Sequence, residues 1–229
     1  MEKRIFNDKI NIMKKDFWRK MISYIFPLSY VYDSDYSEEL EVHYWRGKKM
    51  LNTKNANYSY DSLQKVLETG LKKISLENVK TTLLLGMGGG SIIHSLYNKF
   101  LYQGHVTAVE IDPAVVQIAD EEFEIYPDED LTIICEDALK FVVNQKDKFD
   151  LIIVDLFIDT QVPSPFYQAD FWKNVIQLLN ANGQILFNAG MGLKNQQLNS
   201  FLKNLPKEIS YQIMENVVIN TLVVMKKVN

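Results

Sequence analysis

The stretch that decides the fold is Leu84-Leu85-Gly86-Met87-Gly88-Gly89-Gly90-Ser91. It closes a short apolar run, Thr82–Leu85, that is typical of a buried strand. Glycines let the backbone turn sharply and approach a ligand closely, and a following helix points its free amide groups at that ligand. The G-x-G-x-x-S pattern alone is a weak signal. It fits a nicotinamide dinucleotide as well as another nucleoside ligand, and such turns also occur for packing reasons.

Apolar runs alternate with helical stretches from Tyr58 onward. The strand candidates are Thr82–Leu85, Val106–Val109, Leu131–Cys135, Leu151–Val154, Gln184–Phe187, Tyr211–Met214 and Val217–Met225, and a helix is expected over residues 59–74. The early runs are continuously apolar, as in a parallel sheet covered on both faces, so we expect an α/β fold with a doubly wound, mostly parallel, seven-stranded sheet. Only Glu215-Asn216 separates the last two runs, which predicts an antiparallel C-terminal hairpin at the sheet edge.

The first 57 residues have a different pattern. Apolar side chains recur at three- and four-residue spacing, which predicts an amphipathic helix over residues 9–25 that ends near Pro27. The stripe consists of Ile10, Met13, Phe17, Met21 and Ile25. It can pack on the protein's own core, on a second subunit or on a membrane surface. Residues 28–54 favour a small antiparallel β region, so we expect two parts: an N-terminal helix with this region over 1–57, and the sheet domain over 58–229.

The composition excludes several classes of protein. The chain has 229 residues, 47% of them hydrophobic and 24% charged, which is not the composition of a disordered or collagen-like chain. The net charge of -4 offers no long-range attraction to a polyanion, so we expect no nucleic-acid partner. One cysteine and three scattered histidines show no zinc spacing, which predicts no metal. A charged N-terminus without a long apolar run predicts a soluble, cytoplasmic protein with no membrane span.

Three acidic residues follow three of the predicted strands. Glu110 closes the second strand, where a carboxylate can accept both hydroxyls of a ribose. Asp137 follows the third strand and can accept from the amine of adenine, or cap a helix over residues 138–145. Asp155 ends the fourth strand, at the crevice where open α/β sheets bind ligands, so it can hold a cationic acceptor or take its proton. A solvated strand end is the alternative for Glu110 and Asp155. Asp112-Pro113 predicts a helix N-cap followed by proline at the first helical position.

Together these features resemble the spermidine synthase group of class I S-adenosylmethionine-dependent transferases. The matching features, within residues 40–190, are the hairpin Leu40–Leu51, the segment Asn57-Tyr58-Ser59-Tyr60, the glycine loop, Glu110, Asp137 and Asp155. The resemblance implies a Rossmann-like class I methyltransferase fold and a homodimer formed through the N-terminal region. It implies S-adenosylmethionine, or its decarboxylated form, as cofactor. The implied cofactor-binding residues are Gly86, Met87, Gly88, Gly90, Glu110, Ile111, Asp137 and Ala138. A dehydrogenase is disfavoured, because a nicotinamide site does not need the acid after the third strand.

The sequence departs from the aminopropyltransferases of that group at two acids. Gly89 stands where they have an aspartate in the glycine loop, and Ile158 stands at their second acid after the fourth strand, with Asp159 one residue late. A diamine needs carboxylates at both ends to offset its loss of hydration, so its binding should be weakened. Tyr60 matches a tyrosine of their polyamine pocket. The implied substrate residues are Tyr60, Asp155, Phe157 and Asp159.

We therefore expect a methyltransferase that acts on a small-molecule acceptor, with Asp155 as the catalytic residue. Transfer from a sulfonium is an in-line displacement whose leaving thioether is already activated. The protein need only orient the acceptor and remove its proton. The second hypothesis is an aminopropyltransferase (spermidine synthase) that uses decarboxylated S-adenosylmethionine. The third is a non-catalytic nucleoside-binding or scaffold protein.

Overall fold

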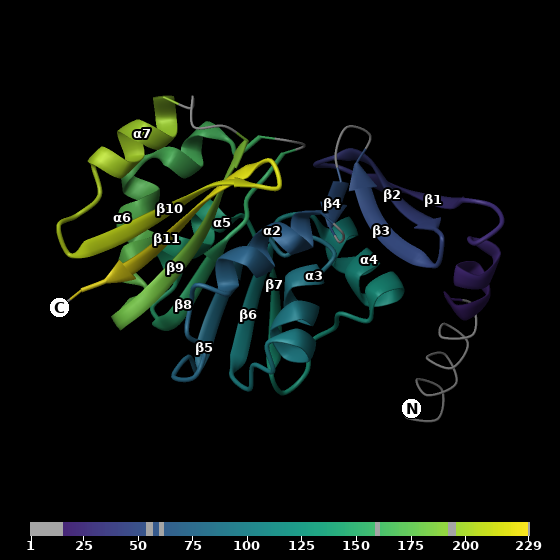
Figure 1. Ribbon diagram of the computed structural model, residues 1–229, viewed down its shortest axis with the longest axis horizontal. Coiled ribbons are helices and arrows are strands. Elements are labelled where there is room, and N and C mark those ends of the chain that lie inside the picture. The colour runs from purple at the N-terminus through teal and green to yellow at the C-terminus, as the bar shows by residue number, and fades with distance from the viewer. Residues whose placement is uncertain (1–15, 54–56, 60–61, 159–160, 192–195, 229) are drawn as a thin grey trace.

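The computed structural model describes residues 16–53, 57–59, 62–158, 161–191 and 196–228, which form two β-sheets flanked by helices (Figure 1). The large sheet has the order β10-β11-β9-β8-β5-β6-β7. Its strands are β5 (Thr81–Leu85), β6 (His105–Glu110), β7 (Leu131–Cys135), β8 (Phe149–Val154), β9 (Leu179–Met191), β10 (Ile209–Val217) and β11 (Asn220–Lys227). The small sheet has the order β1-β2-β3-β4, with strands β1 (Leu28–Ser34), β2 (Glu38–Trp45), β3 (Lys48–Thr53) and β4 (Asn57–Ser59).

The large sheet confirms the predicted architecture. Neighbouring strands from β7 to β9 are parallel, and β11 and β10 complete the sheet as an antiparallel pair at its edge. The position of the C-terminal turn was predicted wrongly. The two strands join through Val218-Ile219, and Glu215-Asn216 instead lie where the register shifts between Met214 and Val217. Asn216 has φ 55°, a left-handed conformation that asparagine tolerates. The two residues that had suggested a turn therefore lie within β10, at an irregularity of the strand.

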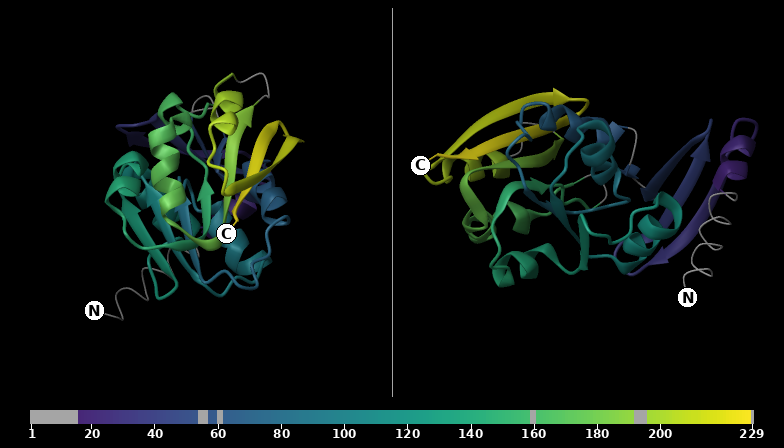
Figure 2. Two further views of the ribbon diagram at one scale, coloured as in Figure 1. Left: turned by 90° about the vertical axis from the view of Figure 1, so that its left-hand side faces the viewer. Right: turned by 90° about the horizontal axis from the view of Figure 1, so that it is seen from below.

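Helices cover both faces of the large sheet (Figure 2). The helices are α2 (Ser62–Leu71), α3 (Ser91–His94), α4 (Pro113–Phe123), α5 (Ala138–Asn144), α6 (Ala169–Gln177) and α7 (Gln196–Lys203), with a π-helical segment η1 (Ser95–Lys99) and a 3-10 turn η2 (Ser164–Tyr167). Buried side chains of α2, α3 and α4 form one apolar cluster, and those of α5, α6 and α7 form another on the opposite face. The helix expected over 59–74 is shorter, and its side chains Val66, Leu67 and Leu71 are buried.

The small sheet shares its core with the large one. Leu40, Val42, Tyr44 and Leu51 are fully buried in the same apolar cluster as α2 and α4. This confirms the prediction of a small antiparallel β region, which β4 extends to Ser59. Along the longest axis of the molecule, this sheet lies at one end and the C-terminal hairpin at the other (Figures 1 and 2).

The helical segment of residues 16–22 turns its polar side toward the protein. Arg19 and Ser23 are buried, whereas Phe17, Met21 and Ile25 of the predicted stripe are 58%, 49% and 73% exposed. The described part of the stripe therefore does not pack on the protein's own core, which was one of its three expected positions. Ile10 and Met13 lie outside the described residues.

A buried ionic cluster around Glu122 attaches this segment to α4. Glu122 Oε1 accepts hydrogen bonds from Arg19 Nη1 at 2.7 Å and Tyr32 OH at 3.1 Å, and Oε2 accepts from Tyr44 OH at 2.7 Å. Lys49 Nζ lies 3.6 Å from Oε2. Burial opposes ionisation of Glu122, but the hydrogen bonds and nearby cations outweigh it and lower the pKa of this carboxyl below its ordinary value.

Candidate functional site at the carboxyl edge of the parallel strands

Four adjacent parallel strands place the predicted site residues along one edge of the large sheet. Gly86 follows β5, Glu110 ends β6, and Asp155 follows β8, while Asp137 lies two residues beyond β7. Strands β7, β6, β5 and β8 are consecutive neighbours in the sheet. Because parallel strands end at the same edge, the four positions lie on one side of the molecule, where open α/β sheets bind ligands.

The glycine loop packs directly against the backbone of Asp155. Gly86 has φ +86°, and a Cβ at this position would lie 2.2 Å from the Asp155 carbonyl oxygen. A side chain is therefore excluded on two grounds, the backbone conformation and the contact. Gly90 has φ +81° and precedes α3, with Ile125 too close for a Cβ. The side chain of Met87 is buried in the core, so only its backbone belongs to the loop surface.

Glu110 lies beneath the glycine loop and is 4% exposed. Its Oε2 accepts a hydrogen bond from Gly88 N at 3.0 Å, and its Oε1 accepts from Ile111 N at 3.0 Å and Asp112 N at 3.2 Å. Burial raises the pKa of the Glu110 carboxyl, although these backbone donors oppose the rise. A carboxylate oxygen can accept more than one hydrogen bond, so the backbone contacts fix the carboxylate without exhausting its lone pairs.

The structure assigns helix caps to two of the predicted acids. Asp137 caps α5 through a hydrogen bond from Leu139 N to Oδ1 at 2.8 Å, which was one of its two expected roles. Asp112 caps α4, with proline at the first helical position, as the sequence predicts. Ala138 is buried behind the Asp137 cap, whereas Ile111 is 37% exposed beside Glu110. Ile111 therefore presents an apolar side chain at the strand edge.

Asp155 is partly buried and bound to a residue that sequence reasoning missed. Asn188 Nδ2 donates a hydrogen bond to Asp155 Oδ1 at 2.8 Å. Burial raises the pKa of the Asp155 carboxyl to about 6, and the Asn188 hydrogen bond lowers it in part. Asn188 directly follows the predicted strand Gln184–Phe187. A polar residue at the end of an apolar strand was the signal that could have identified it.

The predicted substrate residues are only partly described. The ring of Phe157 packs on Gly190, where a Cβ would lie 3.2 Å from the ring. Ile158 is 64% exposed and forms an isolated β-bridge with Gln161. Tyr60 and Asp159 lie outside the described residues.

Two further aromatic residues contribute to the core on the face of α6: Tyr167 belongs to the apolar cluster there, and Phe166 packs against it. Tyr167 is buried and its hydroxyl donates to Ala189 O at 2.9 Å, and Phe166 stacks edge-on against Phe171. Aromatic residues at such positions are thus explained by packing.

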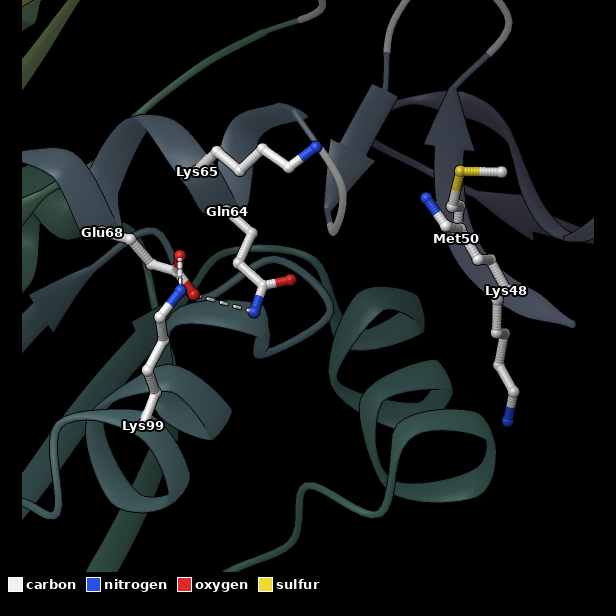
Figure 3. Close-up of a pocket in the computed structure, with 7 residues that line it drawn as sticks. Lys48, Met50, Gln64, Lys65, Glu68 and Lys99 are labelled. Carbon is white, nitrogen blue, oxygen red and sulfur yellow. Dashed lines mark hydrogen bonds and ion pairs between the residues drawn. The ribbon is translucent and has the colours of Figure 1, made fainter.

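A separate cavity of about 400 Å³ lies between β3, α2 and η1 (Figure 3). It is lined by Lys48, Lys49, Met50, Gln64, Lys65, Glu68 and Lys99. Glu68 forms an ion pair with Lys99 and accepts hydrogen bonds from Gln64 Nε2 at 3.3 Å and Ser95 Oγ at 2.8 Å. These contacts hold the Glu68 pKa below its ordinary value against the effect of burial. Among the described residues, no predicted site residue lines this cavity, and its lining comes from β3, α2 and η1 instead of the ends of the parallel strands.

Two negative findings apply to the described ranges. Between residues 16 and 228, leaving out the undescribed gaps, no helix combines the length and apolar character that a membrane span requires. Over the same ranges, no three side chains of the histidine, cysteine, aspartate and glutamate types come together as a metal site would need.

Comparison with known families identifies the chain's relatives. Residues 48–223 match the model of the spermine/spermidine synthase domain. The chain belongs to this family. The match includes the glycine loop, Glu110, Asp137, Asp155 and Asn188, and it confirms the resemblance seen in the sequence.

Curated relatives of this family member fall into two groups. It is 26% identical over 175 residues to the "eEF1A lysine and N-terminal methyltransferase homolog" of Drosophila melanogaster, which covers 70% of this chain and 26% of that protein. It is 30% identical over 109 residues to the polyamine aminopropyltransferase of Vibrio vulnificus, which covers 46% of this chain and 36% of that one. The chain therefore matches only about a quarter to a third of the length of these relatives.

Solved structures of both kinds share the fold. Human methyltransferase-like protein 13 in complex with SAH has a TM-score of 0.62 at 19% identity, covering 74% of this chain and 83% of that one. A probable spermidine synthase from Corynebacterium glutamicum also has a TM-score of 0.62, at 16% identity, covering 89% and 77%. The predicted Rossmann-like class I methyltransferase fold is thus confirmed.

Proposed function

We propose that this family member is an S-adenosylmethionine-dependent methyltransferase that acts on a small-molecule acceptor. One observation carries the proposal: the glycine loop contacts both Glu110, the acid that we assign to the ribose, and Asp155, the acid that we assign to the reacting end. Gly88 N donates to Glu110 Oε2 at 3.0 Å, and Gly86 packs on the Asp155 backbone. A donor laid across the loop would have its ribose above Glu110 and its sulfonium near Asp155.

The proposed cofactor contacts follow from the groups that remain available. Glu110 is held by three backbone donors and keeps acceptor capacity for ribose hydroxyls. Ile111, exposed beside it, offers an apolar face to adenine. Asp137 caps α5 through Oδ1, which leaves Oδ2 for the adenine amine. Gly86, Gly88, Gly90 and the Met87 backbone would allow close approach of the donor's amino-acid end, and Ala138 would pack beside the adenine.

The proposed chemistry requires one acidic group at the reacting end. The acceptor's lone pair attacks the methyl carbon, the carbon–sulfur bond breaks, and its electron pair stays on sulfur in the neutral thioether product. The proton lost by the acceptor goes to Asp155. A pKa of about 6 keeps Asp155 mostly ionised at neutral pH and close to the optimum for a general base. We propose that Phe157, Tyr60 and Asp159 line the acceptor site.

Aminopropyl transfer is the second candidate, and the Vibrio relative and the family match favour it. Against it stand Gly89 and Ile158, which occupy two positions where a diamine-binding enzyme has acids. Ile158 is 64% exposed and apolar. We therefore expect titration calorimetry to show tighter binding of S-adenosylmethionine than of its decarboxylated form. An assay with the decarboxylated donor and putrescine should yield little spermidine; robust spermidine formation would establish the second candidate.

Turnover separates an enzyme from a nucleoside-binding scaffold, the third hypothesis. A panel of small nucleophiles is incubated with S-adenosylmethionine, and the demethylated donor is quantified by mass spectrometry. Release that depends on the acceptor and is lost in Asp155→Asn supports the enzyme. Tight donor binding without acceptor-dependent release by any member would favour the scaffold. We also propose that the protein is cytoplasmic. Because its net charge of -4 offers no attraction to a polyanion, we propose that it has no nucleic-acid partner.

We also propose that the chain forms a homodimer through its N-terminal region. An apolar surface there is made up of Phe17, Trp18, Met21, Ile22, Tyr24, Ile25 and Phe26, each 45–73% exposed. A contiguous surface of this kind marks an interaction site, and one apolar surface can cover its own symmetry copy. Sedimentation velocity should show a dimer that Trp18→Glu dissociates. Val143→Glu, at an apolar residue 64% exposed elsewhere, is the matched control. A monomeric wild type would overturn this proposal.

A further inference from the structure

A chain of buried amides crosses three neighbouring strands behind Asp155. Asn220, at the start of β11, donates from Nδ2 to Asn188 Oδ1 at 2.9 Å. Asn188, on β9, donates from Nδ2 to Asp155 Oδ1 at 2.8 Å, at the end of β8. Asn188 is fully buried and Asn220 is 3% exposed. Buried amides in an otherwise apolar sheet are costly unless their groups are paired, so this arrangement calls for a role.

The backbone fixes the orientation of the Asn188 amide. Gly190 N donates to Asn188 Oδ1 at 3.2 Å, and a backbone N–H can only donate. If the amide were flipped, its NH₂ group would face two donors, Gly190 N and Asn220 Nδ2. Asn188 Oδ1 must therefore point away from Asp155, and Nδ2 must point toward it. Asp155 Oδ1 is then always an acceptor, and a proton on this carboxyl group resides on Oδ2.

We propose that Asn188 is a positioning residue that occupies Asp155 Oδ1, and so makes Asp155 Oδ2 the atom that takes the proton from the acceptor. The proposal rests on the proposed function, which assigns Asp155 as the base. Among the described residues, no donor reaches Oδ2. Asn220 and Gly190 act one step further back, because they hold Asn188 in the productive orientation.

No charged side chain competes with this arrangement in the described part of the chain. The two causes that shift the pKa of Asp155 are its burial and the Asn188 hydrogen bond. The described contacts of Asp155 are all with neutral groups: Leu85 O and Gly86 lie against its backbone, and Asn188 from β9 donates to its carboxylate. Among the described residues, Asn188 is therefore the side chain whose hydrogen bond affects the pKa of Asp155.

The same pair of strands supplies a matched control. Asn180, at the other end of β9, donates from Nδ2 to Asp150 Oδ1 at 2.7 Å. This is the same asparagine–aspartate contact between β9 and β8, at the edge opposite the proposed site. Asn180→Ala should therefore remove a comparable hydrogen bond without affecting Asp155.

The test is a carboxyl ¹³C NMR titration of the full chain, which requires no acceptor. The Asp155 signal is assigned by its loss in Asp155→Asn. Asn188→Ala should raise the Asp155 pKa by about one unit, since a hydrogen bond to a charged group is lost. Asn220→Ala should raise it less, and Asn180→Ala should leave it unchanged. Once an acceptor is known, the acidic limb of the kcat profile should shift in the same order.

Two results would overturn the proposal: an unchanged Asp155 titration in folded Asn188→Ala, or an equal shift in Asn180→Ala. If Asn188→Ala does not fold, Asn220→Ala decides, because it leaves the Asp155 contact in place and removes only its support. An unchanged titration in that variant would then overturn the proposal. Failure of the proposed function looks different, because Asp155→Asn would retain turnover while the titration shifts still occurred.

Discussion

Strands β8 and β9 carry an asparagine–aspartate pair at each end, and the pKa values of the two aspartates are shifted in opposite directions. At the amino end, Asp150 Oδ1 accepts from Asn180, while Oδ2 accepts from Lys80 N at 2.9 Å, Thr81 N at 3.1 Å and Thr81 Oγ1 at 3.3 Å. These donors outweigh burial and lower the pKa of Asp150. At the carboxyl end, Asp155 has one donor among the described residues, and burial raises its pKa to about 6.

The difference separates an acid that stabilises the sheet from an acid that is available for chemistry. A carboxylate whose oxygens are saturated by donors is favoured in its ionised form and has little affinity for a further proton. A carboxylate that is buried with one oxygen unoccupied holds its negative charge at a cost, so it can accept a proton near neutral pH. The same residue type on the same pair of strands thus serves two purposes, and the number of donors distinguishes them.

The largest expected effect is on turnover, and it tests the comparison directly. Asp155→Asn should lower kcat by about 10²–10⁴, the usual contribution of a positioned base, while donor affinity stays within a few-fold. Asp150→Asn should leave kcat close to that of the wild type, because its donors serve the sheet. Steady-state kinetics with a working acceptor, together with calorimetry, measure both quantities. Equal losses of kcat in the two variants would remove the distinction between them.

The second effect concerns Glu122, which joins the N-terminal segment to α4. Like Asp150, it accepts hydrogen bonds at both carboxylate oxygens and has a lowered pKa. Glu122→Gln should lower the free energy of unfolding by about 3–5 kcal/mol, because it leaves the buried Arg19 without its ionised partner, whereas Lys49 keeps its ion pair with Asp16. Donor affinity of the folded protein should not change. Urea denaturation measures the loss, and Glu121→Gln, at the exposed neighbour, is the control. A loss no larger than that of the control would show that saturation does not indicate a stabilising role.

The third effect decides whether Glu110 binds a ligand or has only a structural role. Glu110 accepts hydrogen bonds from three backbone donors and yet has a raised pKa. If it binds ribose, Glu110→Ala should weaken binding of S-adenosylhomocysteine by about 2–4 kcal/mol, since hydrogen bonds to a charged group are worth about 1.5–3 kcal/mol each and are not additive. Titration calorimetry measures the affinity. Unchanged binding would assign Glu110 a structural role like that of Asp150. Tighter binding of NAD by the wild type would contradict the proposed cofactor.

The smallest effect is on the pH dependence of stability, where the two aspartates should have opposite signs. The folded-state pKa of Asp155 is above its ordinary value of 3.8, so its contribution is most favourable below about pH 4 and is lost as the pH rises through about 6. Allowing for partial exposure, the loss should be about 1–2 kcal/mol. The Asp150 contribution is present above pH 3.8 and is lost as the pH falls further.

Denaturation of the wild type, Asp155→Asn and Asp150→Asn across pH 3–7 measures both contributions. The free energy of unfolding of the wild type minus that of Asp155→Asn should decrease from pH 4 to pH 6. The same quantity for Asp150→Asn should decrease as the pH falls below 4. Parallel curves for the two variants would contradict the assigned pKa shifts.

Local patterns in the sequence were sufficient for the order of the elements and for the backbone of the site. The continuous apolar runs predicted a parallel sheet, and Gly86 is required by both a left-handed φ and the contact with Asp155. Prediction failed at one local irregularity and at one contact between distant segments. The C-terminal turn lies at Val218-Ile219 because an irregularity around Asn216 absorbs the residues that had suggested an earlier turn. The N-terminal stripe faces outward because Arg19 is bound to Glu122, a contact across 103 residues.

By itself the sequence determined which strand ends carry acids, because strand periodicity and glycine turns are local properties of the backbone. It did not determine which acid would have a raised pKa, and which would accept hydrogen bonds at both oxygens and have a lowered pKa. Asp150 and Asp155 both belong to the segment around β8, and their difference depends on donors supplied by Lys80, β5 and β9. Only the packed sheet brings those donors together, because the pKa of a buried carboxyl is set by the groups within hydrogen-bonding distance, whatever their separation along the chain.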